Sequence, residues 1–159
     1  MDVIRVGIAD LAAAAAPGRI RTAGLGSCVG IVLYDGRHKI GGMAHIMLPD
    51  SGQARGDVQA AKFADTAVPE LIRRMEALGA HRSRLVAKLA GGAHMFQQVR
   101  SEALKIGERN VEAARAALRA HDIPILAEDT GGTLGRTIEL DLEDGTLYVR
   151  TAQNGEQAL

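Results

Sequence analysis

Two stretches of the sequence have the pattern of a β-hairpin, and they constrain the fold more than any other feature. Residues 31–34 and 40–48 are apolar segments on either side of the turn sequence 35–39, Asp-Gly-Arg-His-Lys. In 138–149, apolar residues alternate with polar ones on both sides of the turn dipeptide Asp144-Gly145. Because hairpins pair antiparallel strands, a purely parallel, doubly wound sheet is excluded.

The remaining elements are predicted from apolar spacing and from the positions of glycine and proline. The spacing indicates helices over 58–79 and 108–121, and Pro69 is a position where the first can break in two. The alanine-rich run 11–16 is stopped by Pro17-Gly18, so we expect a loop or one helical turn there. Further strands are expected over 3–8, 19–23, 85–89 and 123–127. We therefore predict an α+β fold of layered mixed and antiparallel β-sheets, with two main helices as the cover for the apolar sheet faces.

Length and charge limit the domain organisation and the classes of partner. A chain of 159 residues with 47% hydrophobic residues can bury a sizeable core, so we expect one domain over 1–152 and a flexible C-terminal tail over 153–159. Its formal net charge of zero supplies no basic field for nucleic acid. Residues 1–10 contain charges where a secretory signal needs an apolar core, and 11–16 is too short to span a bilayer. We therefore expect a cytoplasmic protein without membrane insertion.

The single cysteine, Cys28, is a candidate nucleophile at the start of the first hairpin. With the turn 35–39 as the hinge, paired positions sum to about 74 or 75, so His45 lies one or two positions from the partner of Cys28. Diagonal side chains on paired strands lie about 7–8 Å apart, within reach if both face the same side. A free thiol is mostly protonated at neutral pH, and a nearby imidazolium stabilises the reactive thiolate. Cys28 and His45 therefore fit the roles of nucleophile and base.

The loop before this cysteine is rich in glycine. Gly24, Gly26 and Gly30 allow a substrate to approach the backbone closely. The loop residues Gly26 and Ser27, together with the N–H of Cys28, are candidates for binding a tetrahedral oxyanion.

A third side chain is expected to orient the imidazole. Thr22, six residues before the cysteine across the glycine-rich bend, offers a hydroxyl for this role. Each residue also has a structural explanation: Cys28 as a small buried hydrophobe, His45 as a core histidine and Thr22 as an ordinary strand residue. No metal or organic cofactor is expected, because one cysteine cannot form a Cys-based zinc site and the other histidines lack metal-ligand spacing.

Several segments resemble, in order, the CheD family of bacterial chemotaxis proteins. The longest matches surround the candidate residues: 22–29, Thr-Ala-Gly-Leu-Gly-Ser-Cys-Val, and 41–49, Gly-Gly-Met-Ala-His-Ile-Met-Leu-Pro. Shorter segments extend the resemblance to about residues 3–150, and they lie within 62–65, 88–96, 106–110 and 127–136.

This resemblance implies an activity, a substrate and roles for residues. It implies hydrolysis of the side-chain amides of specific glutamines on chemoreceptors, giving glutamate and ammonia. Carried over by motif, Cys28 is the nucleophile, His45 the base and then the acid, and Thr22 the orienting group, through a thioester and without a cofactor. It also implies a fold similar to that of the deamidating necrotizing-factor toxins, and some relatives hydrolyse receptor methyl esters as well.

Two other functions stay open on the sequence. CheD proteins in some bacteria bind and stimulate a CheC-type phosphatase, so the resemblance also allows a mainly adaptor role that needs no thiolate. A general cysteine amidase or peptidase acting on small substrates is a third possibility. Met95 and Phe96 are interpreted as core residues or as an apolar lip that contacts a receptor helix.

Overall fold

The structure is a computed structural model that describes residues 2–52, 56, 58–94 and 105–159. Met95 and Phe96 lie outside the described residues. The elements in chain order are β1 (Val3–Arg5), β2 (Leu11–Ala15), β3 (Arg19–Leu25), β4 (Val29–Asp35), β5 (Ile40–Ile46), the 3-10 turn η1 (Ala60–Lys62), α1 (Ala64–Ala77), the 3-10 turn η2 (Arg82–Arg84), β6 (Val86–Gly91), α2 (Ile106–Ala120), β7 (Ile125–Thr130), β8 (Arg136–Asp141), β9 (Leu147–Thr151) and β10 (Gly155–Ala158).

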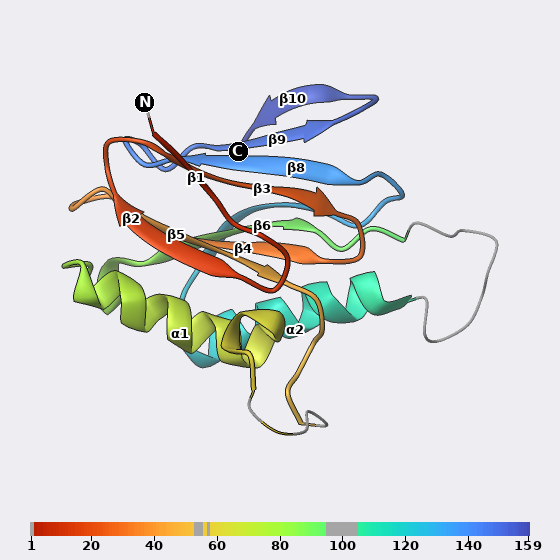
Figure 1. Cartoon of the computed structure of the whole chain (residues 1–159), viewed down its shortest axis with the longest axis horizontal. Helices are drawn as coiled ribbons and strands as arrows, with labels where there is room; N and C mark the ends of the chain where they lie inside the picture. The colour runs from red at the N-terminus through yellow and green to blue at the C-terminus, as the bar shows by residue number, and fades with distance from the viewer. Residues whose placement is uncertain (1, 53–55, 57, 95–104) are drawn as a thin grey trace.

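These elements form three layers (Figure 1). The outer sheet has the order β1-β3-β8-β9-β10, and the central sheet has the order β2-β5-β4-β6-β7. Both sheets are mixed, because β1 runs parallel to β3 and β6 parallel to β7 while the other pairs are antiparallel. Helices α1 and α2 form the third layer on the free face of the central sheet. The predicted α+β class with layered mixed sheets and two helices is confirmed.

The central hairpin of β4 and β5 is buried on both faces, which explains its nearly continuous apolar sequence. In β4, Ile31 and Leu33 pack against the helices, whereas Val32 packs against the outer sheet. Gly30 pairs with His45 and Asp35 with Ile40, so paired positions sum to 75, one of the two sums that the turn predicted. The residues of this hairpin can therefore be assigned to one face or the other by parity.

Both helices cover the same face of the central sheet, so the expectation that helices cover the apolar faces was only half right. The other face packs against β8 and β9 of the outer sheet, whose buried residues include Ile138, Leu140, Leu147 and Val149. The alternating apolar residues that predicted the second hairpin thus lie on the inner face of the outer sheet, in the core between the two sheets. A sheet buries its apolar face as well against another sheet as against a helix.

The prediction of a loop or helical turn over 11–16 was wrong, because this run forms the strand β2. It pairs with β5 from Leu11 opposite Ala44 to Ala15 opposite Ile40. Alanine has a weak preference for strands, but the open edge of β5 supplies backbone partners for it. The small side chains also pack on both sides of the sheet, Ala13 toward the helices and Ala12 and Ala14 toward the outer sheet.

The residues predicted to be a frayed tail, 153–159, contain the strand β10, so that prediction was also wrong. β10 pairs with β9, and Leu159 and Leu147 exchange backbone hydrogen bonds of 2.8 and 3.1 Å. Lys88 Nζ donates to the Leu159 carbonyl at 2.7 Å. The side chains of β10 are exposed and polar, so its pairing depends on backbone bonds that side-chain patterning does not reveal.

The first helix is shorter than expected and is not broken by its proline. It begins at Ala64 after η1, and Pro69 lies inside it. A proline costs the helix one hydrogen bond, but Val68, Leu71 and Ile72 are fully buried around it and hold the helix to the sheet. In the described part, no helix is long and apolar enough to cross a membrane.

A buried carboxylate ties the first hairpin to η2 and gives a prediction about stability. Asp35 accepts hydrogen bonds from Arg84 Nε at 3.1 and 3.3 Å and from the His81 N–H at 2.9 Å. Burial raises the pKa of this carboxyl, but these donors together lower it to about 2. Because the folded pKa lies below the unfolded value near 3.9, the carboxylate stabilises the fold fully above about pH 4, and this contribution is lost as the pH falls through about 2.

We therefore expect Asp35→Asn to lower the free energy of unfolding at pH 7 by about 1–3 kcal/mol, since the amide leaves buried donors unsatisfied. In urea titrations the difference from the parent should shrink as the pH approaches 2. Glu143→Gln, which removes an exposed pair with Lys39 at the neighbouring turn, is the control and should change stability by less than about 0.5 kcal/mol. A difference for Asp35→Asn that is the same at both pH values would contradict this account.

Candidate active site

Three strands bring the predicted residues to one layer, the space between the two sheets. Cys28 directly precedes β4, is half-buried and packs against the core between the sheets. His45 lies on β5 and Thr22 on β3 of the opposite sheet, and both are fully or almost fully buried. The side chains of Thr22 and His45 therefore meet from opposite sheets, although 23 residues separate them in the chain, and Cys28 faces the same layer.

Gly30 lets the two sheets come close beside these residues. It lies opposite His45 in the hairpin and two positions after Cys28, so the cysteine is the diagonal neighbour of the histidine. A Cβ atom at position 30 would lie 2.5 Å from Ile138 Cδ1 of the outer sheet. A side chain there would have to displace the end of the Ile138 side chain.

The hydrogen bonds of Thr22 determine which nitrogen of His45 holds the proton. Thr22 Oγ1 donates its single proton to the Val6 carbonyl at 2.7 Å. The same oxygen lies 2.7 Å from His45 Nδ1, so Nδ1 must be the donor in this second bond. The neutral ring therefore has its lone pair on Nε2, which is buried and has no hydrogen-bond partner in the described part of the chain. This tautomer is the one that can accept a proton from a thiol.

The ionisation states differ from those the sequence predicted. Burial raises the pKa of the Cys28 thiol above its usual range, and a hydrogen bond from its own backbone N–H opposes this only in part. Burial lowers the pKa of His45. Both directions favour a neutral thiol and a neutral imidazole near pH 7. These directions do not support the expected thiolate kept by an imidazolium, and they favour a neutral His45 that can act as a general base.

The backbone of the glycine-rich loop is held from the side of β6. Gly92 N–H donates to the Cys28 carbonyl and Ala93 N–H to the Gly26 carbonyl, both at 2.8 Å. Gly91, at φ +111°, lies so close that a Cβ there would be 2.3 Å from the Cys28 oxygen. The loop thus has a fixed backbone in the absence of any ligand.

The two loop residues proposed for oxyanion binding differ in their backbone groups. Gly26 N–H is engaged with the Gly24 carbonyl at 3.1 Å. The N–H groups of Ser27 and Cys28 donate to no other residue within the described ranges. Ser27 and Cys28 therefore fit an oxyanion site, whereas Gly26 shapes the turn.

One buried residue beside the loop was given no role by the sequence reasoning. Asn110 of α2 is fully buried, and its Nδ2 donates to the Ser27 carbonyl at 2.9 Å and the Met47 carbonyl at 3.0 Å. A signal was present in the sequence, because Asn110 is a polar residue on the apolar stripe that also contains Ala114 and Leu118. Buried polar groups on such stripes have partners, so its presence indicated a contact.

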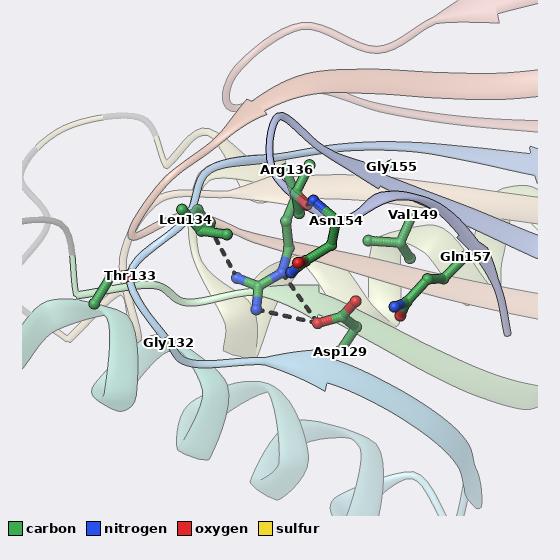
Figure 2. Close-up of a pocket in the computed structure, with 10 residues that line it drawn as sticks. Asp129, Gly132, Thr133, Leu134, Arg136, Val149, Asn154, Gly155 and Gln157 are labelled. Atoms are coloured by element: carbon green, nitrogen blue, oxygen red, sulfur yellow. Dashed lines mark hydrogen bonds and ion pairs between the residues drawn. The ribbon is translucent and has the colours of Figure 1, made fainter.

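A pocket of about 280 Å³ lies where β8 begins, with Asp129, Arg136 and residues 132–134 among those that line it (Figure 2). Arg136 lines it and donates to Asp129, to the Gly131 carbonyl and to the Gly91 carbonyl. Asp129 thus supports the glycine turn 131–132 through Arg136. Arg136 bonds to the Gly91 carbonyl, and the Gly91 backbone packs on that of Cys28. The pocket is therefore linked to the glycine-rich loop through backbone atoms.

Comparisons with known proteins agree along almost the whole chain. The sequence matches the CheD family, described as CheD chemotactic sensory transduction, over residues 47–151. The chemoreceptor glutamine deamidase CheD of Halalkalibacterium halodurans is 52% identical over 160 residues, which cover 99% of each chain. Proteins named probable chemoreceptor glutamine deamidase CheD are similar too: that of Lachnoclostridium phytofermentans is 52% identical over 94% of each chain, and that of Syntrophomonas wolfei is 51% identical over 99% of this chain and 98% of its own.

Proposed function

This chain belongs to the CheD family, and we propose that it is a chemoreceptor glutamine deamidase that uses Cys28 as its nucleophile, His45 as its acid and base, and Thr22 to orient His45. The names of its relatives support the reaction and the substrate. One observation supports the assignment of residues most: the Thr22 hydrogen bond leaves the lone pair of His45 on a buried, unpartnered Nε2 in the layer that Cys28 also faces.

The first half of the reaction cleaves the amide. As glutamine Cδ approaches Cys28 Sγ, His45 Nε2 accepts the thiol proton and the sulfur forms a bond to Cδ. The amide oxygen becomes an oxyanion, which the N–H groups of Ser27 and Cys28 can stabilise. When this intermediate collapses, the C–N bond breaks and His45 returns the proton to nitrogen. Ammonia leaves, and the acyl group stays on Cys28 as a thioester.

The second half restores the enzyme. His45 accepts a proton from a water molecule, whose oxygen attacks the thioester carbon. The C–S bond then breaks, the proton returns to the sulfur, and glutamate is released. Thr22 keeps the Nδ1 proton in place throughout, so that Nε2 alone exchanges protons with the substrate. The same thioester can serve the hydrolysis of a receptor methyl ester.

Further parts of the proposal concern location and partners. We place the reaction in the cytoplasm, because a free reactive thiol persists in a reducing compartment. A CheC-type phosphatase is a proposed second partner, and similarity to the necrotizing-factor toxin fold remains a prediction.

The proposal is tested by alkylating the protein at its single cysteine. The unmodified protein should add about 1 Da to individual glutamines of a chemoreceptor cytoplasmic fragment, as the mass of amide exchanged for acid requires. Protein alkylated once with iodoacetamide should add none, and the receptor fragment should slow the alkylation. Undiminished deamidation by fully alkylated protein would contradict a role for Cys28. If neither form deamidates while a CheC-type phosphatase is stimulated, the adaptor function is correct instead; comparable activity on free glutamine would favour a general amidase.

A further inference from the structure

Asn110 joins the two backbone segments that hold the proposed nucleophile and base. Its Nδ2 donates to the carbonyl of Ser27, the residue before Cys28, at 2.9 Å. The same nitrogen donates to the carbonyl of Met47, two residues after His45, at 3.0 Å. One side-chain amide, fully buried on α2, thus bridges the start of β4 and the end of β5 at the point where the two catalytic groups must meet.

The chemistry of the two carbonyls fixes the orientation of this amide. Both are acceptors only, so the nitrogen must face them and the oxygen must face away. Asn110 Oδ1 is indeed buried without a hydrogen-bond partner among the described residues. Leaving a buried acceptor unsatisfied lowers the stability of the fold. A residue chosen for stability alone would avoid that cost, which points to a need for the two donated bonds.

The first turn of α2 packs on the segment after β6 that holds the glycine-rich loop in place. A Cβ atom on Gly107 would lie 2.5 Å from the Ala93 oxygen and 2.7 Å from the Gly92 oxygen. Gly92 and Ala93 are the residues whose N–H groups hold the Cys28 and Gly26 carbonyls. α2 is therefore joined to the glycine-rich loop in two ways. Its backbone packs on Gly92 and Ala93, which hold the loop, and Asn110 bonds to the Ser27 carbonyl.

We propose that Asn110 is a positioning residue that sets the separation of Cys28 Sγ from His45 Nε2. This inference rests on the proposed roles of Cys28 and His45. Without these two hydrogen bonds, nothing from α2 holds the Ser27 carbonyl and the end of β5 together. The distance between Cys28 Sγ and the His45 ring then varies. A misplacement of about 1 Å can cost about 100-fold in rate.

Asn110→Ala and Asn110→Asp test the proposal. The first removes both donors, and the second keeps the shape but presents oxygen to both carbonyls. We expect kcat for receptor deamidation to fall about 100-fold in each, with KM nearly unchanged because the substrate does not touch this buried residue. We also measure the rate of Cys28 alkylation as a function of pH. In the parent this rate should change as His45 titrates, and in both Asn110 variants that change should disappear.

Leu118→Ala is the matched control, because Leu118 is fully buried on the same helix and contacts the same core away from the loop. All variants are assayed at a temperature at which circular dichroism shows them folded. The proposal is overturned if Asn110→Ala keeps the kcat and the alkylation profile of Leu118→Ala, or if KM alone rises. Cys28→Ala, included in the same assay, separates the two failures: an active Cys28→Ala refutes the proposed function, whereas an inactive one beside an unaffected Asn110→Ala refutes only the role of Asn110.

Discussion

Cys28→Ala is expected to deamidate no receptor glutamine at a measurable rate. The variant lacks the atom that forms the thioester, and loss of a nucleophile in a comparable hydrolase costs on the order of a million-fold in kcat. Stability should change little, because Cys28 is only half-buried and alanine fits the same space. The measurement is the gain of about 1 Da per glutamine on a receptor fragment, with thermal unfolding as the test of folding.

Cys28→Ser is the companion variant. It keeps nearly the same shape but replaces the thiol with a hydroxyl, which is far less acidic and a weaker nucleophile than a thiolate at neutral pH. We expect it to bind the receptor fragment as the parent does and to be almost inactive. Deamidation by Cys28→Ala at the parent rate would show that Cys28 is not the nucleophile. If this variant also stimulated a CheC-type phosphatase, the adaptor function would be supported instead.

His45→Gln is expected to lower kcat about 100- to 10,000-fold, the usual contribution of a general acid and base. Glutamine can still bond to Thr22 but cannot take a proton from the thiol. The pH profile of the parent provides a second measurement. Because burial lowers the pKa of His45, the acidic limb of kcat/KM should lie below the usual histidine value near 6.5. Activity thus requires the neutral ring and is lost as the pH falls through that lowered pKa.

Thr22 supplies the control for the tautomer. Thr22→Ser keeps the hydroxyl that donates to Val6 and accepts from His45 Nδ1, so it should retain most of the activity. Thr22→Val has a similar shape without the hydroxyl and should lose activity while KM stays near that of the parent. Equal activity of the two variants would show that the hydroxyl does not orient the ring. For the parent protein, an acidic limb of kcat/KM at a pH above the usual histidine pKa would instead support a thiolate of Cys28 paired with an imidazolium of His45.

The hairpin of β4 and β5 shows how much of the site the sequence contained. Its turn sets the register, and the register makes Cys28 the diagonal neighbour of His45 through Gly30. The sequence left two registers open, one residue apart, and two-residue alternation puts both side chains on one face only in the register that the structure shows. Local patterning brought the prediction this far because the paired residues are close in sequence.

Two strands with little local signal show where patterning failed. β2 is built almost entirely of alanine, and β10 is polar and exposed, so neither has the alternation that marks a half-buried strand. Each forms because a neighbour, β5 or β9, presents an unpaired edge. The existence of such an edge is a property of the assembled sheet.

The residues that complete the candidate site lie in other elements. Resemblance to a family suggested Thr22, but its contact with His45 depends on how closely the outer sheet packs over the central one. Asn110 reaches the loop only because α2 lies under the ends of β4 and β5. The direction of both pKa shifts likewise follows from burial between layers, and it reversed the expectation of a thiolate beside an imidazolium.

The sequence by itself determined the elements with strong periodicity and narrowed the register of the first hairpin to two possibilities, which placed His45 one or two positions from the partner of Cys28. Both follow from interactions between neighbours along the chain. Only the tertiary structure decided that a second sheet covers the first, which nitrogen of His45 bonds to Thr22, and that burial raises the pKa of Cys28 and lowers that of His45. Those properties depend on distance and on exclusion of water between segments far apart in sequence, which no local pattern encodes.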